Sequence, residues 1–320
     1  MLKLIFYRFL QGSVILLIIS LLVFVLLAAS GGDAVSALEN NRQTSDQTIA
    51  TLRQIYGLDQ PLLLRYANWL SEVARGNLGQ SFYFQAPVWS IIRPRLLNSA
   101  ALATVAMLLA LLVAFTLGLA AAQKENSLMD RLCGVIILLA SSTPRLILAI
   151  LTLSFLARTT LLHGALFSAS ASEPGSLGWL LRILPPALIL SVPLIALLLA
   201  QTRSIVRTTL AEEYVRTARA KGMPERMVLL RHALRPALNP LITTFGYSIG
   251  GLISGSVVVE QIMNWPGLGQ LSVIAVQSRD VALLMGIVLV SSAAVLIGNL
   301  IADILLRLND PRLREETNFS

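Results

Sequence analysis

The chain has 320 residues, of which 55% are hydrophobic and 13% are charged. Soluble domains carry about 25% charged residues, so this composition is typical of a membrane protein and excludes a soluble enzyme. The net charge of +8 indicates basic loops on the cytoplasmic side of a membrane before it indicates nucleic-acid binding. The single cysteine, the two distant histidines and the absence of a GxxxxGK[ST] loop predict no disulfide, metal or ATP site on this chain.

Apolar runs long enough to cross a bilayer, which takes about 20 residues, occur along the whole chain. The first, 9–30, follows basic residues as a signal peptide would, but it is longer than a signal-peptide core, so we interpret it as an uncleaved helix. The remaining spans are predicted at 97–122, 132–157 (interrupted by Arg145), 183–202, 236–259 and 281–301. The sequence therefore predicts an all-α, polytopic membrane protein with six transmembrane helices.

Lysines and arginines predict the orientation of these spans. If the N-terminus lies inside, the inner segments hold most of the basic residues, and the short outer loops hold only Arg158, Arg182 and Arg279. The long outer segment 33–96 also contains arginines, but long loops cross the membrane largely regardless of charge. We therefore predict that both termini lie in the cytoplasm (N-in, C-in).

Three regions follow from this topology. Residues 1–96 are expected to form an N-terminal transmembrane helix plus an extracytoplasmic segment. Residues 97–308 are expected to form a core of five helices with a cytoplasmic loop at 203–240, and residues 309–320 a cytoplasmic tail. In the outer segment, residues 61–70 have apolar side chains at helical spacing. This stretch is predicted to rest on the outer membrane surface or on the bundle, and the alternative is a docking surface for an external partner that delivers substrate.

The inner segment 203–240 holds the most informative pattern. Helix-forming residues continue to Lys221, Gly222 supplies a helix stop, and Pro224 suits the first turn of a second helix. We expect Ala218 and Gly222, one turn apart, on an exposed face where a partner's backbone can come close. The alternative from the residues alone is a plain basic loop with a helix on the membrane surface. Nucleic-acid binding is disfavoured because aromatic residues are not interleaved with the basic ones.

Segment 212–222, EEYVRTARAKG, resembles the EAA loop of ABC importer permeases, and it is most similar to the form found in the dipeptide/oligopeptide/nickel family. Further similarities are GLDQP at 57–61, GNLGQS at 76–81, STP at 142–144 and EQIMNWPGLG at 260–269. The resemblance therefore covers nearly the whole chain, and it is closest to the first of the two permeases in such systems. One departure is Arg216, where the general pattern has glutamate.

The resemblance implies an ABC type I importer permease fold in the bacterial cytoplasmic (inner) membrane. It implies a second homologous permease, two cytoplasmic ATPase subunits and an extracytoplasmic substrate-binding protein as partners. ATP and Mg²⁺ would bind to the ATPases, and this chain would not be an enzyme. The implied cargo is di- or oligopeptides, with nickel, a metallophore or another small solute as alternatives. The residues implied in coupling to the ATPases are Glu212, Glu213, Tyr214, Arg216, Thr217, Ala218, Ala220, Lys221 and Gly222.

Arg145 is predicted near the middle of the third span, directly after Ser142, Thr143 and Pro144. A charge at that depth is costly unless it meets water or a partner. One hypothesis places these four residues on the translocation path, with Arg145 attracting a substrate carboxylate or phosphate. The alternatives are a structural pair with an acid of the partner permease, or a shorter span in which Arg145 reaches the interface.

Two functions of other classes stay open from the residues alone. A self-sufficient channel or secondary transporter is disfavoured, because such proteins carry acidic residues inside the membrane and here only Asp303, near the end of a span, comes close. The other is a structural membrane subunit whose basic loop docks a cytosolic complex without transport.

Overall fold

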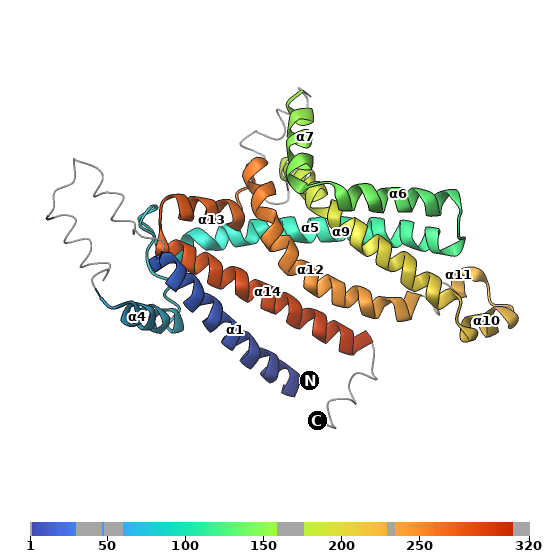
Figure 1. Ribbon diagram of the computed structural model, residues 1–320, viewed down its shortest axis with the longest axis horizontal. Coiled ribbons are helices and arrows are strands. Elements are labelled where there is room, and N and C mark those ends of the chain that lie inside the picture. Colours follow the sequence, from blue (N-terminus) through green and yellow to red (C-terminus); the bar gives the residue numbers. More distant parts are fainter. Residues whose placement is uncertain (1, 30–46, 48–59, 159–175, 229–233, 310–320) are drawn as a thin grey trace. The chain divides into compact units, whose positions relative to one another are not determined.

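The computed structural model describes residues 2–29, 47, 60–158, 176–228 and 234–309 (Figure 1). Helices account for most of these residues, and β pairing within them is limited to one isolated bridge between Gln80 and Pro87. The predicted all-α class is therefore confirmed. The predicted tail, apart from Asn309, and much of the outer segment 33–96 lie outside the described residues.

Most of the predicted spans lie in long apolar helices. Four described helices have the length and composition to cross a membrane: α1 (Leu2–Ala29), α5 (Val88–Gln123), α9 (Leu177–Leu210) and α14 (Val281–Asn309). They contain the predicted second, fourth and sixth spans, and the first as far as Ala29. The predicted fifth span lies in α12 (Leu234–Ile262), whose apolar part, Gly250–Ile262, is shorter. The count of six crossings and the side on which the termini lie stay predictions.

The predicted third span is not one straight helix. It consists of α6 (Leu128–Ser142) and α7 (Arg145–Arg158), whose axes differ in direction by 98°. Pro144 has no backbone N–H and disfavours a helical conformation at the residue before it, so α6 ends and Thr143 is extended. Arg145 therefore begins a new helix at a corner, whereas it was predicted near the middle of the third span, as an interruption of it.

The described chain forms two compact units. The first is Met1–Ser99 with Pro266–Leu296, and the second is Ala100–Trp265 with Ile297–Ser320, so α5 and α14 each contribute residues to both. The predicted regions 1–96, 97–308 and 309–320 are statements about membrane topology and stay predictions.

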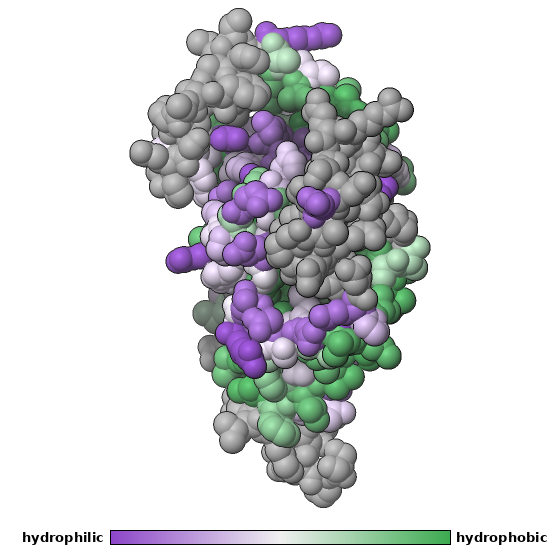
Figure 2. All heavy atoms as spheres, turned by 90° about the vertical axis from the view of Figure 1, so that its left-hand side faces the viewer, coloured by the Kyte–Doolittle hydropathy of each residue, from purple (hydrophilic) through white to green (hydrophobic). Residues whose placement is uncertain are grey.

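In the first unit, the amphipathic helix α4 (Leu62–Ala74) packs on α1. The rings of Tyr66 and Phe24 lie 5.5 Å apart, and the Tyr66 hydroxyl is 2.9 Å from Ser20 Oγ. This agrees with the prediction of a helix over 61–70 that rests on the bundle. Figure 2 faces the side that carries α4 in Figure 1, and hydrophilic residues gather across the middle of that face.

The first unit also contains a buried network of hydrogen bonds at the start of α14. The buried carboxylate of Asp280 accepts hydrogen bonds from Ser81 Oγ (2.5 Å), the Tyr83 backbone N–H (3.0 Å) and the Leu283 backbone N–H (3.0 Å). The bond from Leu283 caps α14, because Asp at this position satisfies a backbone donor of the first turn. Next to it, Leu78, Val88 and Ile92 pack with α13 (Leu268–Gln277) and α14. The segment after α4 is thereby fixed to the start of α14.

In the second unit, α9 is the central helix. It packs against α6, α7 and α12, and small residues on α5 such as Ala106, Ala110 and Ala114 are fully buried in the same core. Gly246 of α12 lies so close to Ala302 of α14 that a Cβ atom on the glycine would overlap the alanine side chain. Small residues at these crossings let the backbones approach, which compensates for the weak hydrophobic drive in lipid.

Candidate functional site

The C-terminal end of α9 leads into the predicted coupling segment. The helix continues beyond the predicted span to Leu210, and α10 (Glu213–Ala220) and the short α11 (Glu225–Met227) follow. Val215 of α10 is fully buried against Val206 and Leu210 of α9, in a small cluster that also holds Val228. The apolar contact therefore fixes α10 on the end of α9. Residues 229–233 of the predicted loop lie outside the described residues.

The end of α10 is defined by a glycine. Gly222 has a positive φ of 77°, the left-handed region that non-glycine residues rarely occupy. Its N–H donates to the Arg219 carbonyl (2.9 Å), and the Met223 N–H donates to the Ala218 carbonyl (3.3 Å). These two bonds form a Schellman motif, which satisfies the last carbonyls of the helix. The predicted helix stop at Gly222 is confirmed.

Ala218 does not lie on an exposed face, so this expectation was wrong. Its exposed fraction is 7%, because it lies one turn from Val215 on the side of α10 that faces α9. Helical spacing places Ala218 with Gly222, but it does not indicate which side of α10 the contact with α9 covers. The small side chain at 218 therefore allows α10 to approach α9 in this chain.

The rest of the predicted coupling residues form an exposed, charged surface on α10, which we call the α10 surface: Glu212, Glu213, Tyr214, Arg216, Thr217, Ala220, Lys221 and Gly222. Glu213 and Arg216 form an exposed ion pair at 3.0 Å. Partial burial and the nearby charge of Glu212 raise the pKa of the Tyr214 phenol above its ordinary value. Arg216 thus has a local partner at the position where the general pattern has glutamate.

A bidentate ion pair joins α10 to α11. The Arg219 guanidinium donates to both carboxylate oxygens of Glu225, at 2.6 Å and 3.2 Å. This hydrogen-bonded pair lowers the pKa of the Glu225 carboxyl and raises the pKa of Arg219. Planar pairing of this kind adds geometric specificity, so it holds α11 at a defined angle beyond the Gly222 turn.

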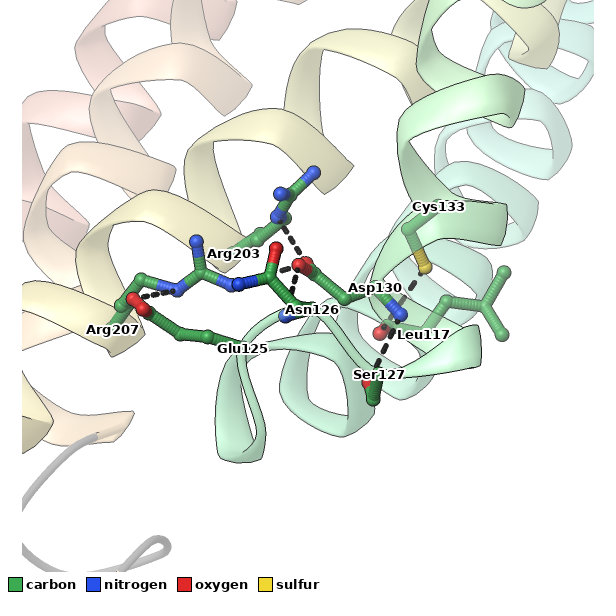
Figure 3. Close-up of polar contacts among 8 residues, drawn as sticks. All are labelled: Leu117, Glu125, Asn126, Ser127, Asp130, Cys133, Arg203 and Arg207. Atoms are coloured by element: carbon green, nitrogen blue, oxygen red, sulfur yellow. Dashed lines mark hydrogen bonds and ion pairs between the residues drawn. The ribbon is translucent and has the colours of Figure 1, made fainter.

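A buried carboxylate ties the start of α6 to the C-terminal part of α9 (Figure 3). Asp130, in the first turn of α6, lies 2.7 Å from Arg203 Nε and 3.1 Å from Arg207 Nη2, and its side chain is 6% exposed. The Asn126 backbone N–H donates to the same carboxylate at 3.1 Å, and Arg207 Nε lies 3.1 Å from Glu125. We call Glu125, Asp130, Arg203 and Arg207 the inner ion cluster.

This cluster was not predicted from the sequence. Ser127 followed by Asp130 three residues later is a sequence pattern that indicates a helix start. In the structure, the Ser127 hydroxyl accepts a hydrogen bond from the Asp130 backbone N–H (3.2 Å). Arg203 and Arg207 are spaced by four residues on one helix face, which was a second available signal. Nothing in the sequence joins these two signals, because they meet only when α6 packs along α9.

The four residues of the predicted translocation path lie together at the corner between α6 and α7. The hydroxyls of Ser142 and Thr143 donate to carbonyls of the preceding turn, Leu138 (2.7 Å) and Leu139 (2.6 Å). Pro144 is exposed, and Arg145 is partly buried at the first position of α7. The bend thus places polar backbone and side-chain groups within an otherwise apolar pair of helices.

Residues 114–315 match the family described as binding-protein-dependent transport system inner membrane component, and residues 1–103 match its N-terminal region. A permease protein of Brucella suis is 35% identical over 98% of this chain and 99% of its own. The oligopeptide transport system permease protein AppB of Bacillus subtilis is 33% identical, covering 96% and 97%. The glutathione transport system permease protein GsiC of Salmonella typhimurium is 34% identical, covering 93% and 94%. The chain therefore belongs to the family of inner-membrane permease subunits of binding-protein-dependent ABC importers.

Proposed function

We propose that this permease couples to cytoplasmic ATPase subunits through the α10 surface. The observation that carries the proposal is the construction of α10: Val215 and Ala218 anchor one side to α9, and the other side is an exposed, charged surface. A helix held this way transmits force to α9 as a rigid body. The Gly222 cap and the Arg219–Glu225 pair add rigidity at the far end.

The proposed assembly contains a second homologous permease, two ATPase subunits and an extracytoplasmic substrate-binding protein. ATP and Mg²⁺ bind to the ATPases, where hydrolysis takes place, and this chain contributes no catalytic group. ATP binding closes the ATPase pair, moves α10 and turns the cavity outward, and hydrolysis returns it inward. Each ligand shifts the equilibrium by binding one of the two conformations better.

Di- or oligopeptides are the proposed cargo. The Bacillus subtilis relative, named as an oligopeptide permease, supports this choice over nearly the full length of both chains. The translocation path includes Ser142, Thr143, Pro144 and Arg145, and the Arg145 guanidinium there attracts the C-terminal carboxylate of a peptide. Glutathione, itself a modified tripeptide, is the second candidate, supported by the Salmonella typhimurium relative.

The test begins with assembly. The tagged chain is purified from its native membrane in nanodiscs, and the subunits that accompany it are identified by mass spectrometry. We expect a second permease and P-loop ATPases. Recovery of the chain alone, under several mild solubilisation conditions, would contradict the proposed assembly.

Cargo is tested next in proteoliposomes that contain the whole transporter and its binding protein. Uptake of radiolabelled tri-alanine is compared with uptake of radiolabelled glutathione, each with ATP and with a non-hydrolysable analogue. ATP-dependent uptake of tri-alanine supports the peptide proposal, and uptake of glutathione alone supports the second candidate. Arg145→Gln is expected to slow tri-alanine uptake more than Arg145→Lys does, and equal uptake by both variants and the native chain would remove Arg145 from the path.

A further inference from the structure

The inner ion cluster lies where the coupling segment, α9 and the broken pair α6–α7 meet. Arg207 belongs to the same C-terminal end of α9 as Val206 and Leu210, which hold Val215 of α10. On its other side, the cluster holds Asp130 in the first turn of α6. A displacement of α10 therefore reaches the start of α6 through the end of α9 and this cluster.

The cluster is balanced in charge, and its shared carboxylate, Asp130, is buried, whereas Arg203 and Arg207 are partly exposed and Glu125 is largely exposed. Two arginines face two carboxylates, and the shared carboxylate of Asp130 also accepts the Asn126 N–H at 3.1 Å. Ion pairs shielded from solvent resist screening by salt and depend steeply on geometry. Sliding between α6 and α9 would break several of these contacts together, so the cluster favours movement of the two helix ends as one body.

The first turn of α6 contributes little apolar packing, because Leu128, Met129 and Leu132 are exposed. The small apolar cluster around Val206 and Leu210 takes Ala122 from α5 and no residue from α6. The apolar packing of α6 on α5 and α9 begins one turn later, at Cys133, which is fully buried in the main core and whose Sγ lies 3.7 Å from the Leu117 carbonyl of α5. At the start of α6, the polar contacts to α9 described by the structure are those of Asp130 with Arg203 and Arg207.

We propose that Asp130, held by Arg203 and Arg207, is a positioning residue that transmits the movement of α10 to α6 and hence to the corner at Thr143 and Pro144. The inference rests on the proposed coupling function of α10. It adds that the broken span, and not only α9, follows the ATPase cycle. Asp130 contacts neither cargo nor nucleotide, and it acts through the position of α6.

The test separates transmission from folding. Asp130→Asn alone would remove the carboxylate that both Arg203 and Arg207 contact. The informative variant is therefore Asp130→Asn with Arg203→Met, which leaves Arg207 paired with Glu125. Asn at 130 still offers an oxygen to the Asn126 N–H. Glu72→Gln is the matched control, because it removes an exposed carboxylate that pairs with Arg75 in the other unit.

Movement of α6 is measured without reference to cargo. In a Cys133→Ala background, Leu138→Cys places a single thiol on an exposed position of α6, and this thiol is labelled with bimane in the whole transporter in nanodiscs. The change in bimane fluorescence between the nucleotide-free and the ATP–vanadate states reports the response of α6. We expect the double variant to retain its ATPase subunits. Its bimane response should be at least about fivefold smaller than that of the native chain, the lower end of typical coupling effects. The Glu72→Gln control is expected to keep the full response.

A full bimane response in the double variant would overturn the inference, because α6 would then follow α10 without the ionic contact. Loss of the ATPase subunits from the double variant alone would also overturn it, because the cluster would then shape the docking site. If the unaltered chain and the Glu72→Gln control also lack ATPase subunits, the proposed coupling function itself fails.

Discussion

Arg219 and Glu225 form a bidentate ion pair across the turn made by Gly222, with distances of 2.6 Å and 3.2 Å. The pair lowers the pKa of Glu225 below its ordinary value of 4.5. A lowered carboxyl pKa stabilises the folded arrangement above the ordinary value, and this stabilisation is lost as the pH falls through the lowered pKa. Because both side chains are partly exposed, the expected contribution is about 0.2–1 kcal/mol.

We therefore expect hydrogen exchange of the backbone amides in 213–228, corrected for the intrinsic rate, to become faster as the pH falls below the ordinary Glu value of 4.5 and through the lowered pKa of Glu225. Glu225→Gln removes the titrating group and should exchange at the faster level throughout. An identical pH response in the native chain and in Glu225→Gln would show that other groups cause the change.

Gly222→Ala should weaken the coupling segment. The position has a φ of 77°, and a Cβ there would meet nothing within 4 Å, so the cost comes from the backbone alone. An alanine in the left-handed region costs about 1–2 kcal/mol, whereas Gly222→Asn should cost less, since Asn tolerates this conformation. The ATPase rate of the purified transporter should be highest with Gly222, lower in Gly222→Asn and lowest in Gly222→Ala. A native rate in Gly222→Ala would contradict this expectation.

Substitutions at Ala218 and Ala220 should have different effects, because the first is buried and the second is exposed. Ala218→Leu overpacks the contact between α10 and α9, at a cost of about 1–3 kcal/mol, and should reduce both the thermal stability of the chain and ATPase retention. Ala220→Leu should leave stability within about 0.5 kcal/mol and reduce ATPase retention alone. Full retention in Ala220→Leu would place the ATPase contact elsewhere.

The glycines of α12 offer a second matched pair. Gly246→Ala forces a Cβ into the Ala302 side chain, whereas Gly251→Ala meets nothing within 4 Å. We expect the first change to lower the melting temperature of the detergent-solubilised protein. The second should be neutral or raise it, since replacing a helical glycine by alanine gains about 1 kcal/mol. Equal melting temperatures for the two variants would contradict the close crossing of α12 and α14.

The predictions that the structure confirms depend on the properties of single residues and their near neighbours in the sequence. Gly222 ends a helix because glycine readily adopts a positive φ, and Pro224 begins the next because its ring fixes φ. Both properties are local, so the end of α10 could be predicted from the sequence. The same rule, applied to Pro144, would have predicted the break between α6 and α7. The apolar composition on both sides of Pro144 hid this break, because a bent pair and a straight span have the same hydropathy.

Tertiary contacts account for what the sequence analysis missed. The face of α10 that is buried depends on where Val215 meets α9, so helical spacing alone could not separate Ala218 from Ala220. Asp130 and Arg207 are 77 residues apart, and only the packing of α6 along α9 brings them together. The predicted helix on 61–70, by contrast, is an amphipathic local pattern, and α4 reproduces it.

The hydrogen bond from Ser81 to Asp280 joins residues 199 positions apart. During synthesis, the segment after α4 is made long before the start of α14, so its buried polar partner does not yet exist. This outer segment can reach its final conformation only when most of the chain has been inserted. A product that stops before Asp280 would leave this segment without its buried polar partner, so an incomplete permease would be more open to proteolysis than the finished chain.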